Sequence, residues 1–180
     1  MALTLGLRKL IRTAHITITV GWIGAVACFL LLSIVGLTSR DAKVVQAAYL
    51  SMQLIAKFVI VPLSFAPLVT GPLLSLGTPW GLFRHYWILA KLVITILCTI
   101  TMQIHMQPIN QLAVTAAKVG MLDHDLRKLQ VQMVVASSAA LVALLTALVL
   151  AVYKPRGMTA YGWRKQYEEG ISPPGIDATT

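Results

Sequence analysis

Four long apolar segments constrain this chain more strongly than any other feature of its sequence. A helix needs roughly 20 residues to cross about 30 Å of hydrocarbon, and all four segments reach that length without an Asp or a Glu. Hydrophobic residues make up 57% of the 180 residues and charged residues only 12%, which excludes an ordinary soluble domain. The segments are residues 13–37, 44–76, 86–106 and 131–153.

These segments predict an all-α integral membrane protein, a four-helix bundle. Only helices and closed barrels satisfy every backbone polar group within hydrocarbon, and the long runs of Leu, Val, Ile and Ala lack the alternation of barrel strands. The connections at 38–43 and 77–84 are short, so we expect successive helices to pack as antiparallel neighbours. Residues 1–153 should therefore form one transmembrane domain.

Two regions of this domain allow more than one arrangement. Segment 44–76 is longer than one span needs, so we expect it to be tilted, kinked at a proline, or extended by an amphipathic stretch at 46–53. The connection 107–130 is the one long connection, and residues 113–130 within it could form a surface helix that carries several charged side chains.

The basic residues indicate the orientation of the chain in the membrane. Lys and Arg flank the apolar segments, where they meet phosphate headgroups, so we expect no nucleic-acid partner despite the net charge of +9. Cytoplasmic flanks collect Lys and Arg, and the larger set places both termini in the cytoplasm. That set is Arg8, Lys9, Arg12, Arg84, Lys154, Arg156, Arg164 and Lys165, against Arg40, Lys43, Lys118, Arg127 and Lys128 outside.

The cytoplasmic tail, residues 154–180, has two parts. Residues 154–170 mix basic with aromatic side chains, as a segment lying on an anionic leaflet would, although a solvated flank of the last span has the same composition. Residues 171–180 contain two prolines and small polar residues, which predicts disorder.

Four ionisable side chains lie inside the apolar segments, where such groups are costly and mark functional sites. They are His15, Lys57, Lys91 and His105. Because every acidic residue lies in a loop or in the tail, neither lysine has a carboxylate partner within a span. Each lysine therefore reaches an interface, loses its proton, or pairs with an anion that is not part of the chain, such as a lipid phosphate or a porphyrin propionate.

Heptad spacing places these groups on interior faces of two helices. Lys91, Cys98 and His105 are seven residues apart and form one polar stripe. His15 and Trp22 share the same spacing on the first segment. Small residues beside them, Gly21, Gly24, Ala25 and Cys28, predict a close helix contact there, with Cys28 and Cys98 as buried free thiols.

Depth in the membrane selects the groups that could act together. His15 and Lys91 lie near the cytoplasmic ends of their segments, whereas His105 is roughly 20 Å further along its helix. One haem held by His15 and His105 is therefore geometrically poor. We expect a cofactor site made of His15, Lys91 and Trp22, with His85 or Tyr86 nearby and His15 as a ligand of haem iron, although a lone His near an interface also bonds headgroups or backbone.

No other chemistry is indicated by the sequence. Motifs for zinc enzymes, hydrolases and nucleotide hydrolases are absent, and no pair of carboxylates is available for acid–base catalysis. Whether the protein is an enzyme stays open.

Short motifs in three segments resemble those of small bacterial four-helix membrane proteins. The first segment carries the pattern H-x6-W-x-G over residues 15–24. The other positions that are similar are Pro62, Thr70 and Gly71 in the second segment and Trp87 and Lys91 in the third.

The resembling proteins comprise a family of unknown function, which is the most similar, the copper-resistance domain of CopD type, and the membrane-bound protoporphyrinogen oxidase of HemJ type. In the oxidase family a His on the first helix and a Lys on the third are the functional pair, which implies the same for His15 and Lys91. The resemblance also implies a multi-pass protein of the bacterial plasma membrane.

Two functions from different classes follow. The first is a site for haem b or a porphyrin between the first and third helices, used for redox or tetrapyrrole chemistry. The second is a membrane protein without a cofactor, either a partner subunit or a permease for small solutes or metals. Either could act as a homo- or hetero-oligomer in the lipid bilayer.

Overall fold

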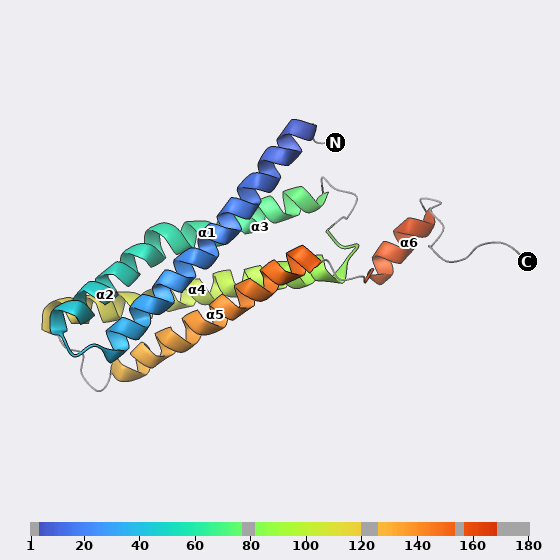
Figure 1. Ribbon diagram of the computed structural model, residues 1–180. Helices are drawn as coiled ribbons and strands as arrows, with labels where there is room; N and C mark the ends of the chain where they lie inside the picture. The colour runs from blue at the N-terminus through green and yellow to red at the C-terminus, as the bar shows by residue number, and fades with distance from the viewer. Residues whose placement is uncertain (1–3, 77–81, 120–125, 154–156, 169–180) are drawn as a thin grey trace, which may run out of the picture.

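The structure is a computed structural model that describes residues 4–76, 82–119, 126–153 and 157–168. Long helices dominate it, and four of them have the length and apolar composition of membrane spans: Leu5–Thr38, Ala42–Ser75, Tyr86–Lys118 and Arg127–Tyr153. The elements (Figure 1) are α1 (Leu5–Thr38), α2 (Ala42–Ile55), the π-helix η1 (Ala56–Ile60), α3 (Val61–Leu76), α4 (Tyr86–Val119), α5 (Arg127–Tyr153) and α6 (Ala160–Glu168).

Contacts between the helices define a four-membered bundle. Helix α1 packs against α2, α3 and α5, and α4 packs against the same three elements. Because α2 and α3 belong to one span, α1 and α4 lie diagonally across the bundle (Figure 1). Side chains from the start of α1, the end of α3, the start of α4 and the end of α5 line one cavity, and we call this end the N-terminal end of the bundle.

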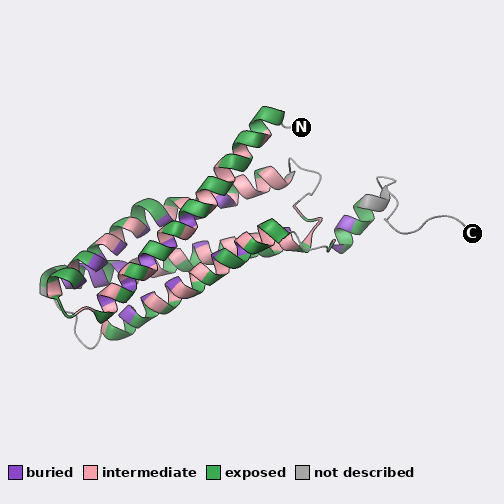
Figure 2. Cartoon of the chain, viewed as in Figure 1, coloured by how far each residue is buried: buried purple, intermediate pink, exposed green. Residues whose placement is uncertain are grey.

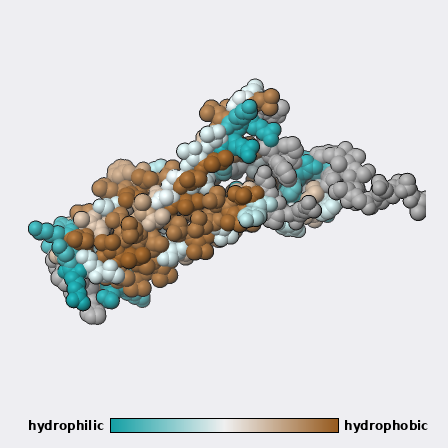
Figure 3. All heavy atoms as spheres, in the orientation of Figure 1, coloured by the Kyte–Doolittle hydropathy of each residue, from teal (hydrophilic) through white to brown (hydrophobic). Residues whose placement is uncertain are grey.

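The outer surface of the bundle is apolar. Large hydrophobic side chains are exposed along every span, among them Leu31, Phe65, Leu97 and Val142, and Figure 3 shows a hydrophobic band with hydrophilic groups gathered beyond it at both ends. Such a band must be covered by hydrocarbon to be stable. The fold is therefore that of a multi-pass integral membrane protein, as the sequence predicts.

One face of α1 supplies much of the core. Its buried residues recur every three or four positions, as expected for the inner face of a helix (Figure 2). Cys28 and Gly24 lie on another face and are exposed, so the prediction that Cys28 is a buried thiol is wrong. Nothing lies within 4 Å of a Cβ placed on Gly24, so no close helix contact forms there. The buried residues are Trp22, Val26, Phe29, Ser33 and Gly36.

The second span is one long helix whose middle turn is π-helical. The turn η1 joins α2 directly to α3, and Pro67 and Pro72 lie inside α3. Pro62, the second residue of α3, has no amide hydrogen to donate to a carbonyl of the preceding turn. Lys57 lies on this π turn, is exposed and has its Nζ 5.5 Å from the centre of the Phe58 ring.

The third span is longer than the sequence predicts. Helix α4 continues without a break to Val119, so the prediction of a separate surface helix at 113–130 is wrong. Leu112, Ala113 and Ala116 are fully buried, and the Gln53 side-chain amide donates to the Asn110 Oδ1 at 2.9 Å. These contacts with α2 hold the end of α4 in the bundle.

The short helix α6 is attached beside the start of α4. Thr159 N donates to Arg84 O at 2.9 Å, and the Thr159 hydroxyl donates to Phe83 O. The same hydroxyl accepts from Gly162 N at 3.1 Å, as an N-cap does. A Cβ on Gly162 would lie 2.5 Å from Arg84 O, which explains a glycine at this position. The predicted disorder of 171–180 lies outside the described residues.

A close contact between α1 and α2 leads to the first prediction. A Cβ on Gly36 would lie 2.6 Å from Cζ of Tyr49, whose side chain is only 1% exposed. We expect Gly36→Ala to lower the free energy of unfolding by about 1–3 kcal/mol, because the enclosed ring has no room to move. Thermal unfolding in detergent measures the change. Gly24→Ala is the matched control, and an equal loss of stability in both variants would contradict the contact.

Candidate functional site

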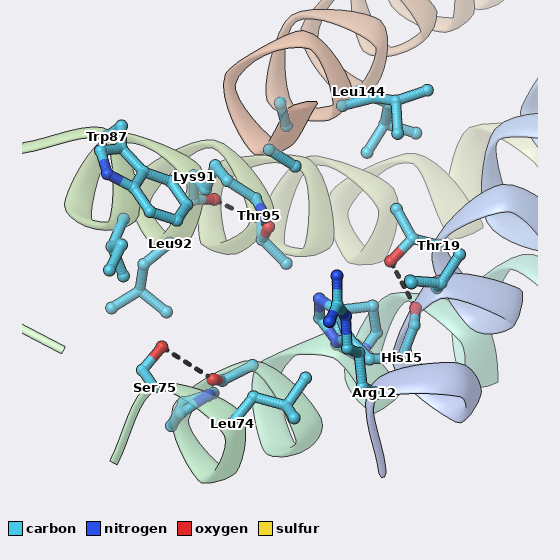
Figure 4. Close-up of a pocket in the computed structure, with 18 of the residues that line it drawn as sticks. Arg12, His15, Thr19, Leu74, Ser75, Trp87, Lys91, Leu92, Thr95 and Leu144 are labelled. Carbon is cyan, nitrogen blue, oxygen red and sulfur yellow. Dashed lines mark hydrogen bonds between the residues drawn. The ribbon is translucent and has the colours of Figure 1, made fainter. Parts of the chain in front are cut away.

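A cavity of about 560 Å³ opens at the N-terminal end of the bundle between α1, α3, α4 and α5. This volume falls in the range of small-molecule sites, about 300–1,000 Å³. Figure 4 shows its polar side chains, with His15 and Arg12 on α1 and Lys91 and Thr95 on α4. Residues from α3 include Pro67, Gly71 and Ser75, and those from α5 include Leu144, Ala147 and Ala151.

One face of α1 carries the polar wall of the cavity. Arg8, Arg12, His15, Thr19 and Trp22 all line it, and their spacing of three or four residues puts them in a single row along the helix. The Thr19 hydroxyl donates to His15 O at 2.8 Å, so it is satisfied within its own helix. The two arginines, His15 and Trp22 are thus the residues on this row whose polar side-chain atoms are not bonded within the helix.

The His15 ring is held by a hydrogen bond to another helix. Its Nδ1 lies 2.7 Å from the Thr70 hydroxyl oxygen, and that hydroxyl donates its own hydrogen to Ala66 O at 2.9 Å. A hydroxyl has one hydrogen, so in the tautomer with its proton on Nδ1, His15 donates to Thr70 and both bonds are made at once. Gly71 follows Thr70 and lies against the same ring, since a Cβ there would be 3.6 Å from Cε1. The Nε2 atom consequently bears the free lone pair.

Lys91 reaches the cavity from the opposite corner of the bundle. Its Nζ lies 5.9 Å from the centre of the Trp87 ring, and it interacts electrostatically with His15. The Thr95 hydroxyl donates to Lys91 O at 2.8 Å and does not neutralise the ammonium group. No Asp or Glu is found among the described residues that line the cavity. Lys91 therefore has no counterion within this part of the chain.

Trp22 closes the deep end of the cavity. It is 2% exposed, and its Nε1 has no hydrogen-bond partner. With Leu144 it also lines a second cavity of about 50 Å³, to which Cys98 and His105 contribute. A buried indole N–H without a partner is costly.

The second cavity separates His105 from the candidate site. His105 Nδ1 lies 2.7 Å from Thr101 O, and its Nε2 lies 3.4 Å from the side-chain nitrogen of Gln132. Of the two cavities, Lys91 lines the larger one, whereas Cys98 and His105 line the smaller one. The polar stripe that these three residues form on α4 therefore faces the interior of the bundle, as predicted. His85 and Tyr86 are not among the residues that line either cavity.

The structure brings together the three residues selected from the sequence, His15, Trp22 and Lys91. It adds Arg8 and Arg12, which the sequence analysis had assigned to the lipid headgroups. Their signal was present in the sequence, because they continue the helical row of His15 and Trp22 by one and two turns. Thr70 was noted only as part of a motif, and nothing local to it indicates its bond with His15.

The cavity lining offers an imidazole nitrogen, cations and an apolar wall. His15 offers a lone pair on Nε2 while its other nitrogen is bonded, which is the usual arrangement of a metal-bound imidazole. The unpaired cations suit acidic side groups, and the apolar wall formed by Pro67, Leu144 and Ala147 suits a flat macrocycle. In the described part of the chain no group of three or more His, Cys, Asp or Glu could hold a bare metal ion.

The unpaired cation of Lys91 leads to the second prediction. We expect Lys91→Met to raise the free energy of unfolding of the ligand-free protein by about 1 kcal/mol, because it removes a partly buried charge that lacks a counterion. Chemical or thermal unfolding in detergent measures it. Lys57→Met, at an exposed lysine on the π turn, should change little. A loss of stability in Lys91→Met would show that the ammonium group is well paired.

Comparison with known proteins gives no match: no family model fits the chain, and neither a curated protein nor a solved structure is significantly similar to it. The relationship to the CopD and HemJ types stays a prediction from the motifs.

Proposed function

We propose that this protein is a four-helix protein of the bacterial plasma membrane, with antiparallel neighbours and both termini in the cytoplasm. The support is the distribution of basic residues. Arg8, Lys9 and Arg12 stand at the N-terminal end of the bundle, and Arg84, Arg164 and Lys165 belong to the segments attached there. Lys and Arg concentrate on cytoplasmic flanks, so the mouth of the cavity faces the cytoplasm.

We further propose that the cavity binds haem b or a porphyrin. The observation that carries this proposal is the His15–Thr70 hydrogen bond, because it fixes the ring with the Nε2 lone pair available beside cations that lack counterions. Iron, when bound, would supply one-electron redox chemistry. His15 holds the metal, and Thr70 fixes the tautomer and orientation of His15.

The other residues complete the binding site. Lys91 attracts an acidic side group of the ligand from the α4 side, and the Trp22 side chain contributes to the wall. The buried side chains of Leu144 and Ala147 keep water from the face of the macrocycle. A porphyrin without iron would use the same contacts except the bond from Nε2.

The third prediction tests this function against a cofactor-free partner subunit or permease. Protein purified in a non-ionic detergent and titrated with haem should shift and sharpen the Soret band relative to haem in empty micelles, and His15→Ala should remove this change because the substitution deletes the iron ligand. His105→Ala is the matched control and should leave the band unchanged. A haem spectrum that is the same with the wild-type protein as in empty detergent micelles would contradict haem binding.

Thr70→Val supplies the fourth prediction. The substitution keeps the shape of the side chain but removes the acceptor for His15 Nδ1–H. Loss of such an outer partner typically lowers metal affinity about 10- to 100-fold, and we expect haem affinity to fall by that factor. Titration followed at the Soret band measures it. An unchanged affinity would mean that Thr70 does not orient the ligand.

A further inference from the structure

Two arginines at the mouth of the cavity are not needed to hold a ligand at His15. Arg8 and Arg12 lie seven and three residues before His15 on α1, which places them roughly 10 Å and 4.5 Å nearer the N-terminal end. Both line the cavity. Figure 4 shows the Arg12 and His15 side chains coming from α1 at the wall of the cavity.

Neither arginine has a partner of opposite charge among the described residues. In the segments that the structure describes, no hydrogen bond or ion pair involves the side chain of Arg8 or Arg12, and no carboxylate lines the cavity. A neighbour on the same helix, Lys9, is exposed and does not line the cavity. The cavity therefore gathers two guanidinium groups on α1 and one ammonium group, that of Lys91, on α4.

Guanidinium groups have a specific preference among anions. Their planar fork matches the two oxygens of a carboxylate or the oxygens of a phosphate, and they remain charged at all physiological pH values. Arg8 and Arg12 lie one turn apart on one face, so both can reach the same acidic group. Lys91 lies on the opposite side of the cavity and serves a different one.

We infer that Arg8 and Arg12 form a subsite for an acidic group of the ligand, separate from Lys91, so that the cavity selects an amphiphile with at least two anionic groups. This inference rests on the proposed function and specifies its ligand class: a tetrapyrrole with free carboxylates and not a neutral or esterified one. The arginines determine specificity and do not touch the iron.

Lipid phosphate offers the same chemistry as a ligand carboxylate, so the experiment must separate these two sources. The probes are protoporphyrin IX, which has two free carboxylates, and its dimethyl ester, which has none. Both are titrated by fluorescence into the full-length protein in a non-ionic detergent. The proteins are the wild type, the double variant Arg8→Gln/Arg12→Gln, and Lys9→Gln as the matched control.

We expect the wild type and Lys9→Gln to bind the diacid at least about tenfold more tightly than the ester, the factor typical of a hydrogen bond to a charged group. The double variant should lose most of this preference while it keeps its affinity for the ester, which shows that it is folded. Addition of phosphatidylglycerol should leave the preference of the wild type unchanged.

Three results would overturn the inference. Equal affinity of the wild type for diacid and ester would do so while the proposed function stands. A preference that phosphatidylglycerol abolishes would assign the arginines to lipid phosphate. If the wild type binds neither probe, both the proposed function and this subsite are contradicted.

Discussion

Hydrocarbon offers no hydrogen bonds, and the whole structure follows from that constraint. Each backbone group must find its partner within the protein, so the chain forms long helices. The same constraint governs the hydroxyl groups within the spans: Ser33, Ser64 and Thr70 all donate to carbonyls of their own helices. Polar groups of the spans are thus mostly satisfied locally. The groups that are not, above all Lys91 and the Trp22 N–H, stand out for that reason.

The candidate site combines a rigid His with cations that lack counterions. The hydrogen bond between Thr70 and His15 joins two different spans. The Thr70 hydroxyl accepts this bond while it donates its own hydrogen to Ala66 O. Lys91 lies on α4, diagonally across the bundle from α1. The width of the cavity therefore separates its positive charge from those of Arg8 and Arg12. Such an arrangement is costly when empty and favours an anion with an apolar body, which fills the space and neutralises the charge together.

The sequence predicted the fold better than it predicted the site. Hydropathy and length identify spans because contact with lipid is a property of each segment alone. The end of α4 was misjudged because its burial and the hydrogen bond between Asn110 and Gln53 of α2 depend on residues that are distant in the sequence. Cys28 was misjudged because a small side chain suits lipid as well as a helix contact. Heptad spacing placed His15 and Lys91 correctly on interior faces, whereas the bond to Thr70 joins residues 55 positions apart.

The π-helical turn Ala56–Ile60 sets the rotation of everything that follows it in the second span. One turn of a π-helix contains about one residue more than one turn of an α-helix. Each residue of an α-helix rotates the chain by about 100°. If these same residues formed a regular α-helix, the extra residue would rotate Thr70 by about 100°, away from His15. The position of the acceptor for His15 therefore depends partly on the π conformation of a turn that does not itself reach the cavity.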